Sequence, residues 1–373
     1  MIQRSLKKQI TEKLFKGKVI ILYGPRQVGK TTLIKEIAKN YQQKSKYLNC
    51  ELLSVQEVLS KPEAETIKSY FGDKTLIILD EAQKIKNIGT ILKILVDTYP
   101  KLQIIATWSS SFELGNSLQE PLTGRNFTFE MYPISLQEII TYKDKIYCKA
   151  KLESLLRFGA YPEVFLLPEQ DGRERLEEIA SDYLYKDLLM FDWLKKSSVI
   201  KKLLQLLALQ LGNEVSLQEL AINLWINRLT VQKYLDLLEK SFVIFQLPAF
   251  SRNKRIEISK GTKIYFYDLG IRNALIQNFA PLELRNDVWA LWENFCIIER
   301  IKFLASKNIF RNKYFWRTYT QKEVDYIEEY DGTIHGYEFK YTKNAFSPPK
   351  IFEEQYKNKV KLINRDNLFS FME

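Results

Sequence analysis

Histidine and cysteine are almost absent from this chain, which has one histidine and three cysteines among 373 residues. A single histidine excludes His-rich metal sites and disfavours hydrolytic mechanisms built on a Ser-His or Cys-His pair. The cysteines, Cys50, Cys148 and Cys296, are far apart and odd in number, so they form neither a zinc spacing nor a disulfide framework. This usage fits a reducing compartment, and we expect a cytoplasmic protein.

Long hydrophobic runs are also missing. No stretch reaches the length of a transmembrane helix, and the first residues lack the apolar segment of a signal peptide. We therefore expect no membrane partner. The chain is nevertheless 46% hydrophobic and 13% aromatic, which is enough to build folded cores.

Basic residues outnumber acidic ones, with 56 Lys and Arg against 45 Asp and Glu and a net charge of +11. Such a balance favours a polyanionic partner, most often nucleic acid, and we expect DNA. An ordinary basic surface remains the alternative on charge alone.

A glycine-rich loop at residues 24–31 lies between an apolar run at 18–23 and an amphipathic stretch at 32–40. Strand, glycine loop and helix in this order predict a phosphate-binding loop. The two glycines permit a tight turn, and the following helix adds its positive dipole end to the anion site. The residues expected to bind the nucleotide here are Gly24, Pro25, Arg26, Gln27, Val28, Gly29, Lys30, Thr31 and Thr32.

Within this loop we expect Lys30 to reach the β- and γ-phosphates of ATP and Thr31 to ligate Mg²⁺. A second apolar run ends in Asp80 and Glu81. We expect Asp80 to hold the magnesium ion and Glu81 to orient the attacking water.

Two more residues are candidates for the same site. Thr107, or one of the serines after it, follows another apolar run and could contact the γ-phosphate or the water; a polar turn is the alternative. Arg125 could act as an arginine finger, within the chain or toward a neighbouring subunit, or form an ordinary surface ion pair.

Strands at 46–50, 75–79, 102–107 and 126–131 alternate with helices, which predicts a parallel sheet covered on both faces. We predict an α/β protein of several domains. They are a P-loop ATPase core at 1–134, a helical lid at 135–197, a winged helix at 198–261 and a C-terminal α/β domain at 262–373.

The winged-helix prediction rests on three helical stretches followed by a strand at 242–247. In this layout the third helix enters the major groove of DNA. Basic and amide side chains are expected on that helix and on the wing: Arg228, Gln232 and Lys233, then Arg252, Lys254, Arg255, Lys260 and Lys263. A protein-contact module is the alternative.

In the last domain, Asp325 and Glu338 are expected on adjacent strands, and Lys340 lies two residues after Glu338. Strand alternation puts Glu338 and Lys340 on one face. Two carboxylates and a lysine can form a magnesium site that activates water, with Glu293 as a further ligand. A cross-strand salt bridge is the alternative.

These motifs together resemble a prokaryotic family of AAA-type ATPases that carry a C-terminal domain of unassigned function. The resemblance spans nearly the whole chain and rests on the following segments: GPRQVGKTT, LIILDEAQ, LTGR, YPISLQE, FGAYPEV, YFYDLG, WENF, FWRTYTQKEVDYI and YEFK. It implies a restriction-endonuclease-like (PD-(D/E)xK) fold at the C-terminus, with Glu293, Asp325, Glu338 and Lys340 at its centre.

One position departs from the family pattern, because Trp108 stands where a glycine is expected after Thr107. We therefore expect an altered sensor geometry. Three functions stay open: an ATP-regulated DNA-processing enzyme, an ATP-dependent switch whose nuclease-like fold is silent, and an interaction platform. A homo-oligomer and a protein partner are both compatible with the sequence.

Overall fold

We describe the chain from a computed structural model. The residues it describes are 2–61, 63–109, 122–186, 197–251, 261–318, 320, 322–342 and 345–372. They form two compact units. Unit 1 comprises 1–134 and 240–242, and unit 2 comprises 135–239 and 243–373.

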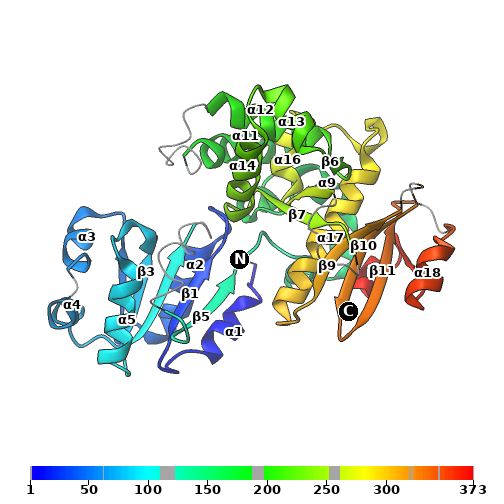
Figure 1. Cartoon of the computed structure of the whole chain (residues 1–373). Coiled ribbons are helices and arrows are strands. Elements are labelled where there is room, and N and C mark those ends of the chain that lie inside the picture. The colour runs from blue at the N-terminus through cyan, green and yellow to red at the C-terminus, as the bar shows by residue number, and fades with distance from the viewer. Residues whose placement is uncertain are drawn as a thin grey trace. The chain divides into compact units, whose positions relative to one another are not determined.

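Unit 1 is built on a parallel five-stranded sheet with the order β2-β3-β4-β1-β5, and the predicted α/β core is thereby confirmed (Figure 1). Because β4 lies between β1 and β3, the ends of these three strands meet at one edge of the sheet. The strands are β1 (Val19–Tyr23), β2 (Ser45–Asn49), β3 (Leu76–Asp80), β4 (Gln103–Trp108) and β5 (Asn126–Glu130).

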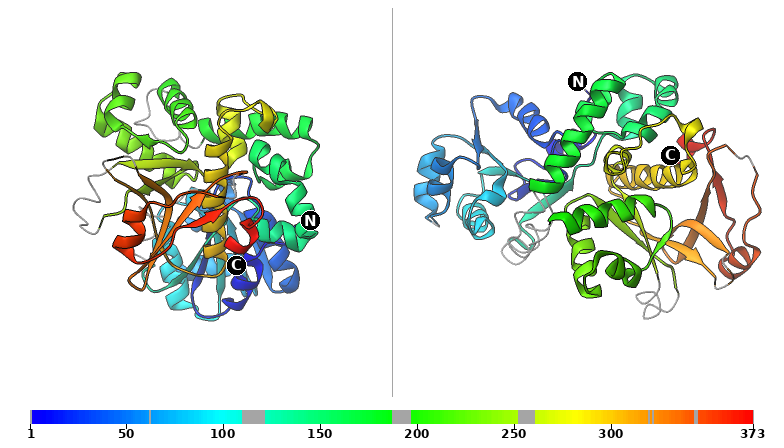
Figure 2. Two further views of the ribbon diagram at one scale, coloured as in Figure 1. Left: turned by 90° about the vertical axis from the view of Figure 1, so that its right-hand side faces the viewer. Right: turned by 90° about the horizontal axis from the view of Figure 1, so that it is seen from above.

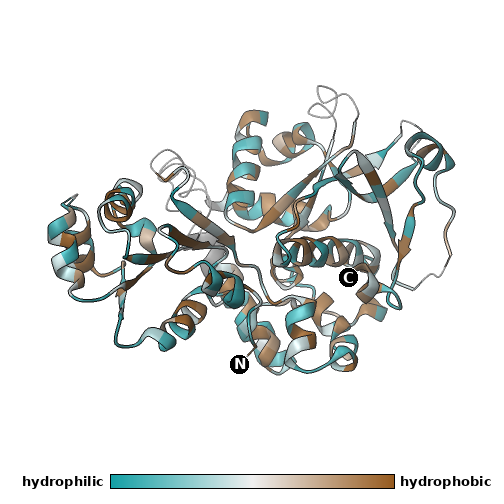
Figure 3. Cartoon of the chain, turned by 90° about the horizontal axis from the view of Figure 1, so that it is seen from below, coloured by the Kyte–Doolittle hydropathy of each residue, from teal (hydrophilic) through white to brown (hydrophobic). Residues whose placement is uncertain are grey.

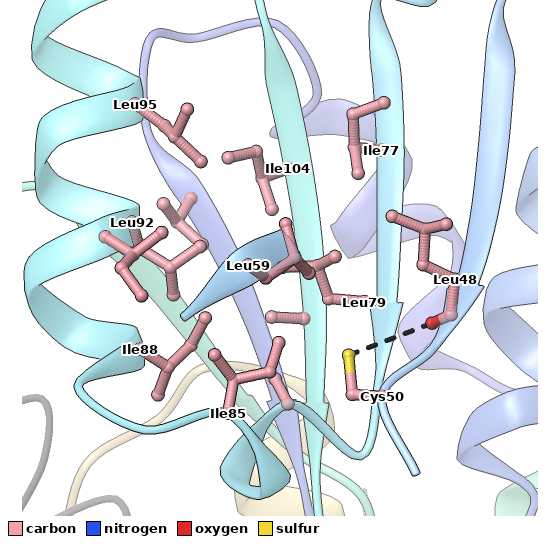
Figure 4. Close-up of a cluster of buried hydrophobic side chains, with 14 of the residues drawn as sticks. Leu48, Cys50, Leu59, Ile77, Leu79, Ile85, Ile88, Leu92, Leu95 and Ile104 are labelled. Atoms are coloured by element: carbon pink, nitrogen blue, oxygen red, sulfur yellow. Dashed lines mark hydrogen bonds between the residues drawn. The ribbon is translucent and has the colours of Figure 1, made fainter. Parts of the chain in front are cut away.

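The central strands are buried on both faces, which explains why they read as continuous apolar runs. On one face Leu79 and Ile104 pack against Leu92 and Leu95 of the helix α5 (Ile88–Thr98), as Figure 4 shows. Burial of such aliphatic side chains contributes roughly 2 kcal/mol each to folding.

The remaining helices of unit 1 are short. They are α1 (Leu6–Glu12), α2 (Lys30–Ala38), η1 (Lys39–Tyr41), α3 (Leu53–Leu59), α4 (Ala64–Phe71) and η2 (Ala82–Lys84). Helix α2 begins directly after the glycine-rich loop, as predicted, and it buries Leu33, Ile34 and Ile37.

Unit 2 begins with a group of helices that includes the segment predicted as a lid of the ATPase. They are α7 (Leu136–Tyr142), α8 (Lys145–Ala150), α9 (Leu152–Phe158), α10 (Pro162–Leu166) and α11 (Glu169–Lys186). These helices pack with α16 (Leu269–Leu275), where the Asn273 amide donates to the carbonyls of Leu156 (3.0 Å) and Arg157 (2.8 Å). The helices at 135–186 therefore belong to unit 2 and not to unit 1, contrary to the predicted lid of the N-terminal domain.

Three helices and a small antiparallel sheet follow: α12 (Ser197–Leu209), α13 (Leu217–Leu224) and α14 (Arg228–Lys240), with β6 (Glu214–Val215), β7 (Ile244–Pro248) and β8 (Thr262–Phe266). Ser216 caps α13 by accepting from the Glu219 N–H at 3.3 Å. Strand β8 pairs with both β6 and β7, so the predicted domain boundary at 261 falls between two paired strands.

The C-terminal part of unit 2 contains a further sheet, ordered β12-β11-β10-β9, which lies beside the long helix α17 (Val288–Ser306) (Figure 2). Its strands are β9 (Asn312–Arg317), β10 (Glu323–Tyr330), β11 (Thr333–Phe339) and β12 (Lys361–Ile363), and the remaining short helices are η3 (Leu282–Leu284), α18 (Lys350–Tyr356) and α19 (Leu368–Phe371).

Helix α17 buries polar as well as apolar residues along its length. Arg300, for example, donates from Nε to Glu328 Oε1 of β10 at 2.8 Å. Charged side chains are tolerated inside this unit because they are paired. Brown, hydrophobic positions recur along the strands and helices in Figure 3, yet no helix among the described residues has the length and hydrophobicity needed to cross a bilayer.

Candidate functional site

The glycine-rich loop connects the carboxyl end of β1 to the amino end of α2. Gly24 is required sterically, since a Cβ at this position would lie 2.1 Å from the carbonyl oxygen of Met131. Gly29, at the N-cap of α2, has a φ of +95°, which side chains rarely permit. Both glycines therefore serve the turn that the motif predicts.

The remaining loop residues differ in exposure. Pro25, Val28 and Lys30 are buried, Arg26, Gly29 and Thr31 are partly buried, and Gln27 and Thr32 are exposed. The Lys30 ammonium donates to the carbonyls of Gly24 (2.8 Å) and Pro25 (2.7 Å) and so lies over the loop itself.

Arg4, which belongs to none of the predicted motifs, holds the loop from outside. Its Nη1 donates to the Val28 carbonyl at 2.6 Å, and its Nη2 donates to the Tyr132 carbonyl. Arginine can bridge two carbonyls in this way because its donors are arranged in a planar fork.

Asp80, at the end of β3, accepts hydrogen bonds from three side chains of the site. Its Oδ2 accepts from the Thr31 hydroxyl at 2.8 Å and from the Tyr47 hydroxyl at 2.6 Å, and its Oδ1 accepts from Thr107 at 2.6 Å. Burial, followed by the hydrogen bond to Asp80, raises the pKa of Tyr47. The structure thus brings together Thr31, Asp80 and Thr107, while Tyr47 is a contact that the sequence patterns did not reveal.

Glu81 is placed by its backbone as well as by its side chain. It adopts a left-handed conformation with a φ of +56°, and its N–H donates to Thr107 Oγ1 at 2.9 Å. Gln83 Nε2 donates both to Glu81 Oε2 at 2.5 Å and to Ser109 Oγ at 2.8 Å. Left-handed non-glycine residues often mark functional sites, because the strain must be compensated by surrounding contacts. Gln83 also went unrecognised, although it lies in the same LIILDEAQ segment as Asp80.

Trp108, the departure from the family pattern, points into the core of unit 1. Its side chain is fully buried in the cluster that packs against α5, and no described residue forms a hydrogen bond with its Nε1. The indole therefore does not displace Thr107, which keeps its hydrogen bond to Asp80. Of the serines after it, Ser110 and Ser111 lie outside the described residues.

Arg125 lies at the opposite edge of the sheet from the loop. Its carbonyl accepts from the Val19 N–H at 2.9 Å, at the amino ends of β1 and β5. A five-residue strand spans roughly 15 Å, so this position is remote from the loop at the carboxyl end. Its Nε donates to Asp97 at 2.7 Å. The expected action on a nucleotide within the same chain is therefore wrong for this geometry, and an action toward a neighbouring subunit stays a prediction.

Unit 2 contains a second cluster of charged residues. Asp325 lies at a register shift between Val324 and Ile327 of β10, and its Oδ2 accepts from the Phe339 N–H at 2.9 Å. Glu338, on the neighbouring strand β11, forms an ion pair of 2.7 Å with Lys340. The bulge matters because such irregularities often re-aim a side chain beside a functional site.

Glu293 of α17 is occupied by other partners. Its Oε1 accepts from Lys263 Nζ at 2.9 Å and from the Tyr265 hydroxyl, and Lys263 also pairs with Glu323. Lys263 is only 3% exposed in its side chain, so the expectation that it contacts DNA on a wing is wrong. The other wing lysines and arginines, at 252–260, lie outside the described residues.

The carboxyl groups of Glu293, Asp325 and Glu338 all have raised pKa values. Burial, and then the charge of Asp325, raises the pKa of Glu338 to about 7. Burial also raises the pKa of Glu293 to about 7, against the opposing effect of Lys263, and it raises the pKa of Asp325. Carboxyl groups with raised pKa values are common at sites that handle metals or protons.

The predicted three-carboxylate metal centre is not assembled. Among the described residues, no three His, Cys, Asp or Glu side chains are placed to hold a metal ion. The reason is that Glu293 is bound by Lys263 and Tyr265, which leaves Asp325 and Glu338 as the neighbouring pair. Lys263 and Tyr265 are two residues apart on β8 and therefore lie on the same face of the strand. This spacing is the signal in the sequence that could have indicated that both contact one partner.

The residues of both sites fit a hydrated magnesium ion. In unit 1 a hydroxyl and a carboxylate, from Thr31 and Asp80, already lie within hydrogen-bonding distance of each other. In unit 2 the buried Glu338 Oε2 has no hydrogen-bond donor among the described residues. Magnesium keeps several of its waters and needs only one or two protein carboxylates, so either donor set is sufficient.

One protein-family model matches the part of unit 1 that contains the glycine-rich loop and Asp80. Residues 16–140 match a family model described as an AAA domain. This segment of unit 1 is similar to AAA domains, and it contains the loop, β3 and β4, and thus every contact described around Asp80. Residues 149–282 and 290–368 match two models described as domains of unknown function, DUF8612 and DUF4143.

Two relatives align with most of the chain at low identity. An uncharacterized protein of Mycobacterium tuberculosis is 26% identical over 344 residues, covering 91% of this chain and 74% of that protein. An uncharacterized protein of Methanocaldococcus jannaschii is 26% identical over 336 residues, covering 82% and 75%. Among solved structures, the Thermotoga maritima RuvB Holliday junction branch migration motor aligns over 65% of this chain and 89% of its own, at 17% identity. Its TM-score of 0.34 is too low to carry a functional argument.

Proposed function

We propose that this chain binds Mg²⁺ and ATP at the loop of its AAA domain and hydrolyses the γ-phosphate. The carrying observation is the Asp80 carboxylate, which accepts hydrogen bonds from both Thr31 and Thr107 at the carboxyl edge of the sheet. Thr31 and Asp80 would hold the ion, Lys30 would contact the phosphates, and magnesium would supply charge neutralisation at the phosphates when bound.

Glu81 is the proposed general base, and hydrogen bonds with Thr107 and Gln83 hold it in place. The Thr107 hydroxyl links the Glu81 N–H to the Asp80 carboxylate, so the metal-binding and water-orienting residues form one hydrogen-bonded chain. Gln83 holds the Glu81 carboxylate through Oε2, which leaves Oε1 for the water. Arg26, Gln27, Val28 and Thr32 complete the proposed nucleotide site as the lining and rim of the loop.

Glu81→Gln is the experiment that tests hydrolysis. We expect ATP turnover to fall roughly 100- to 1,000-fold, since general-base catalysis is worth about 10²–10⁴ and the amide cannot accept the proton. Nucleotide affinity should stay within about twofold, because Glu81 makes no proposed contact with the phosphates. The measurement is phosphate release beside equilibrium binding of a fluorescent ATP analogue, with Glu51→Gln as a control at an exposed site on the same unit. Unchanged turnover in Glu81→Gln would contradict the assignment.

For unit 2 we propose DNA as the partner, with α12, α13, α14 and the β6-β8-β7 sheet acting as a winged helix. Helix, strand, helix, helix and hairpin follow one another in the order of that motif. Arg228 and Lys233 are exposed on α14, the helix that such a motif places against DNA, and Gln232 is partly exposed.

A second candidate function is metal-dependent DNA cleavage at Asp325, Glu338 and Lys340, with Glu293 as an outer residue held by Lys263. The observation that favours it is the Glu338–Lys340 pair beside a β-bulge at Asp325. The alternative is an ATP-dependent switch in which this site is catalytically silent and the chain acts through a bound protein or through its own oligomer.

A DNA-cleavage assay distinguishes the nuclease from the silent switch. With plasmid, linear and single-stranded DNA, Mg²⁺ or Mn²⁺, and ATP present or absent, we expect the wild type to cut. Lys340→Ala and Asp325→Ala should lose roughly 100-fold or more of that activity, because each removes a charge placed at the reacting phosphate. Lys322→Ala, an exposed lysine before β10, is the matched control and should cut normally. Folded wild type that binds ATP but cuts no DNA would favour the silent switch.

A further inference from the structure

Hydrophobic side chains, and not only basic ones, are exposed where α13 turns into α14. Trp225, in the turn, is 91% exposed, Leu229 in the first turn of α14 is 74% exposed, and Ile222 at the end of α13 is 65% exposed. We call these three residues the turn patch. Isolated exposed apolar residues are ordinary, but three neighbours around one turn indicate a contact surface.

The charge around the turn patch favours a polyanion. No Asp or Glu occurs from Leu220 to Leu235, while Arg228 and Lys233 are exposed within that stretch. A third cation comes from α12, because Lys202 Nζ donates to the Asn223 carbonyl at 2.9 Å, two residues before Trp225. Proteins that bind single strands combine exposed aromatic side chains, which stack on bases, with cations that contact the phosphates.

A polar cavity of about 440 Å³ adjoins the same helix. Arg228 and Gln232 of α14 line it together with Ser216, Gln218 and Gln246. Amide and hydroxyl groups of this kind form hydrogen bonds with base edges. Paired and unpaired bases both offer such edges, so this lining favours a nucleic-acid partner, and it is the exposed indole that favours unpaired bases.

We propose that the turn patch binds single-stranded DNA, with the Trp225 indole stacked on an unpaired base and Arg228, Lys233 and Lys202 at the phosphates. This inference deepens the proposed DNA-binding function, on which it rests, by naming unpaired bases as the recognised feature. The indole of a residue exposed in a turn stacks at least cost on a base that is already free of its own neighbours, because insertion into a duplex first requires unstacking. The apolar Leu229 beside it has no hydrogen-bonding group with which to read a groove.

The test uses the full chain and three fluorescein-labelled probes: a dT oligomer, an abasic oligomer with the same number of phosphates, and a duplex of equal length. We expect the dT probe to bind most tightly. Trp225→Ala should weaken dT binding about 5- to 100-fold, which corresponds to the stacking of one base, and should leave the abasic probe unchanged. Trp225→Phe should restore most of the affinity. Phe310→Ala removes another aromatic side chain of unit 2, 86% exposed, and should have no effect.

Each other outcome has a defined meaning. If Trp225→Ala binds dT as the wild type does, the inference is overturned. If the duplex binds most tightly and is indifferent to Trp225→Ala, the inference fails while the proposed DNA-binding function survives. If no probe binds even at low salt, both fail. If Trp225→Ala leaves DNA binding intact but abolishes self-association in sedimentation, the patch is a protein contact and the inference is also overturned.

Discussion

Replacing Lys30 with alanine is expected to weaken ATP binding roughly 100-fold, because a buried ammonium that contacts phosphates contributes about 1.5–3 kcal/mol per charge-assisted hydrogen bond. In the structure this ammonium is already placed over the loop, bonded to the Gly24 and Pro25 carbonyls. It would exchange those carbonyls for phosphate oxygens on binding. The measurement is titration of a fluorescent ATP analogue with Mg²⁺ present.

Lys39→Ala is the matched control for Lys30→Ala, since Lys39 follows the same helix and is exposed. It removes an equal charge from unit 1 and should change the affinity by less than about twofold. Thermal unfolding must also be compared, because Lys30 is buried and its loss removes two hydrogen bonds from the loop. A folded Lys30→Ala variant with wild-type nucleotide affinity would refute the P-loop assignment.

Lys263→Met is expected to destabilise unit 2 by about 3–5 kcal/mol, the typical cost of leaving buried charges without their partner. Lys263 pairs with both Glu293 and Glu323, and it also faces Asp325 electrostatically. Burial by itself lowers the pKa of Lys263, but these carboxylates outweigh burial and keep the pKa above its usual value. The lysine therefore stays charged, but burial raises the pKa of its partner Glu293 to about 7, so the stabilising effect of Lys263 should grow as the pH rises from about 6 to 8 and Glu293 ionises.

Denaturant unfolding followed by tryptophan fluorescence measures this effect. Lys322→Met, at an exposed lysine, should change the free energy of unfolding by no more than about 0.5 kcal/mol. Combining Lys263→Met with Glu293→Gln should recover roughly 1–3 kcal/mol, because one orphaned carboxylate is then neutral. A Lys263→Met variant as stable as the wild type would show that the buried ion pairs contribute nothing net to folding.

The ion pair between Lys263 and Glu293 also affects how the cleavage test must be designed. Lys263 belongs to β8, which pairs with β7 in the proposed winged helix, whereas Glu293, Glu323 and Asp325 belong to the C-terminal helix and sheet. These two parts of unit 2 therefore share a buried ionic cluster. A variant that loses both stability and cleavage at Lys263 would be uninformative about catalysis, which is why the cleavage test relies on the partly exposed Lys340.

The local motifs were readable because they depend on residues close together in the chain. The loop at residues 24–31, the run ending in Asp80 and the order of strands and helices follow from glycine conformations and from apolar periodicity. The placement of Glu338 and Lys340 on one face of a strand is likewise local. Each of these expectations involves a separation of a few residues, over which backbone geometry dictates which side chains meet.

Only the tertiary structure decided which residues far apart in the sequence make contact. Tyr47 and Thr107 reach Asp80 because β4 lies beside β3 and β2 lies on its other side, and Arg4 reaches the loop from before the first helix. Arg125 proved to lie at the far edge of the sheet because its position depends on the direction in which β5 runs. Lys263 was mistaken for a surface residue because charge alone does not tell whether partners will surround it, and its partners are Glu293 and Glu323, 30 and 60 positions further along the sequence.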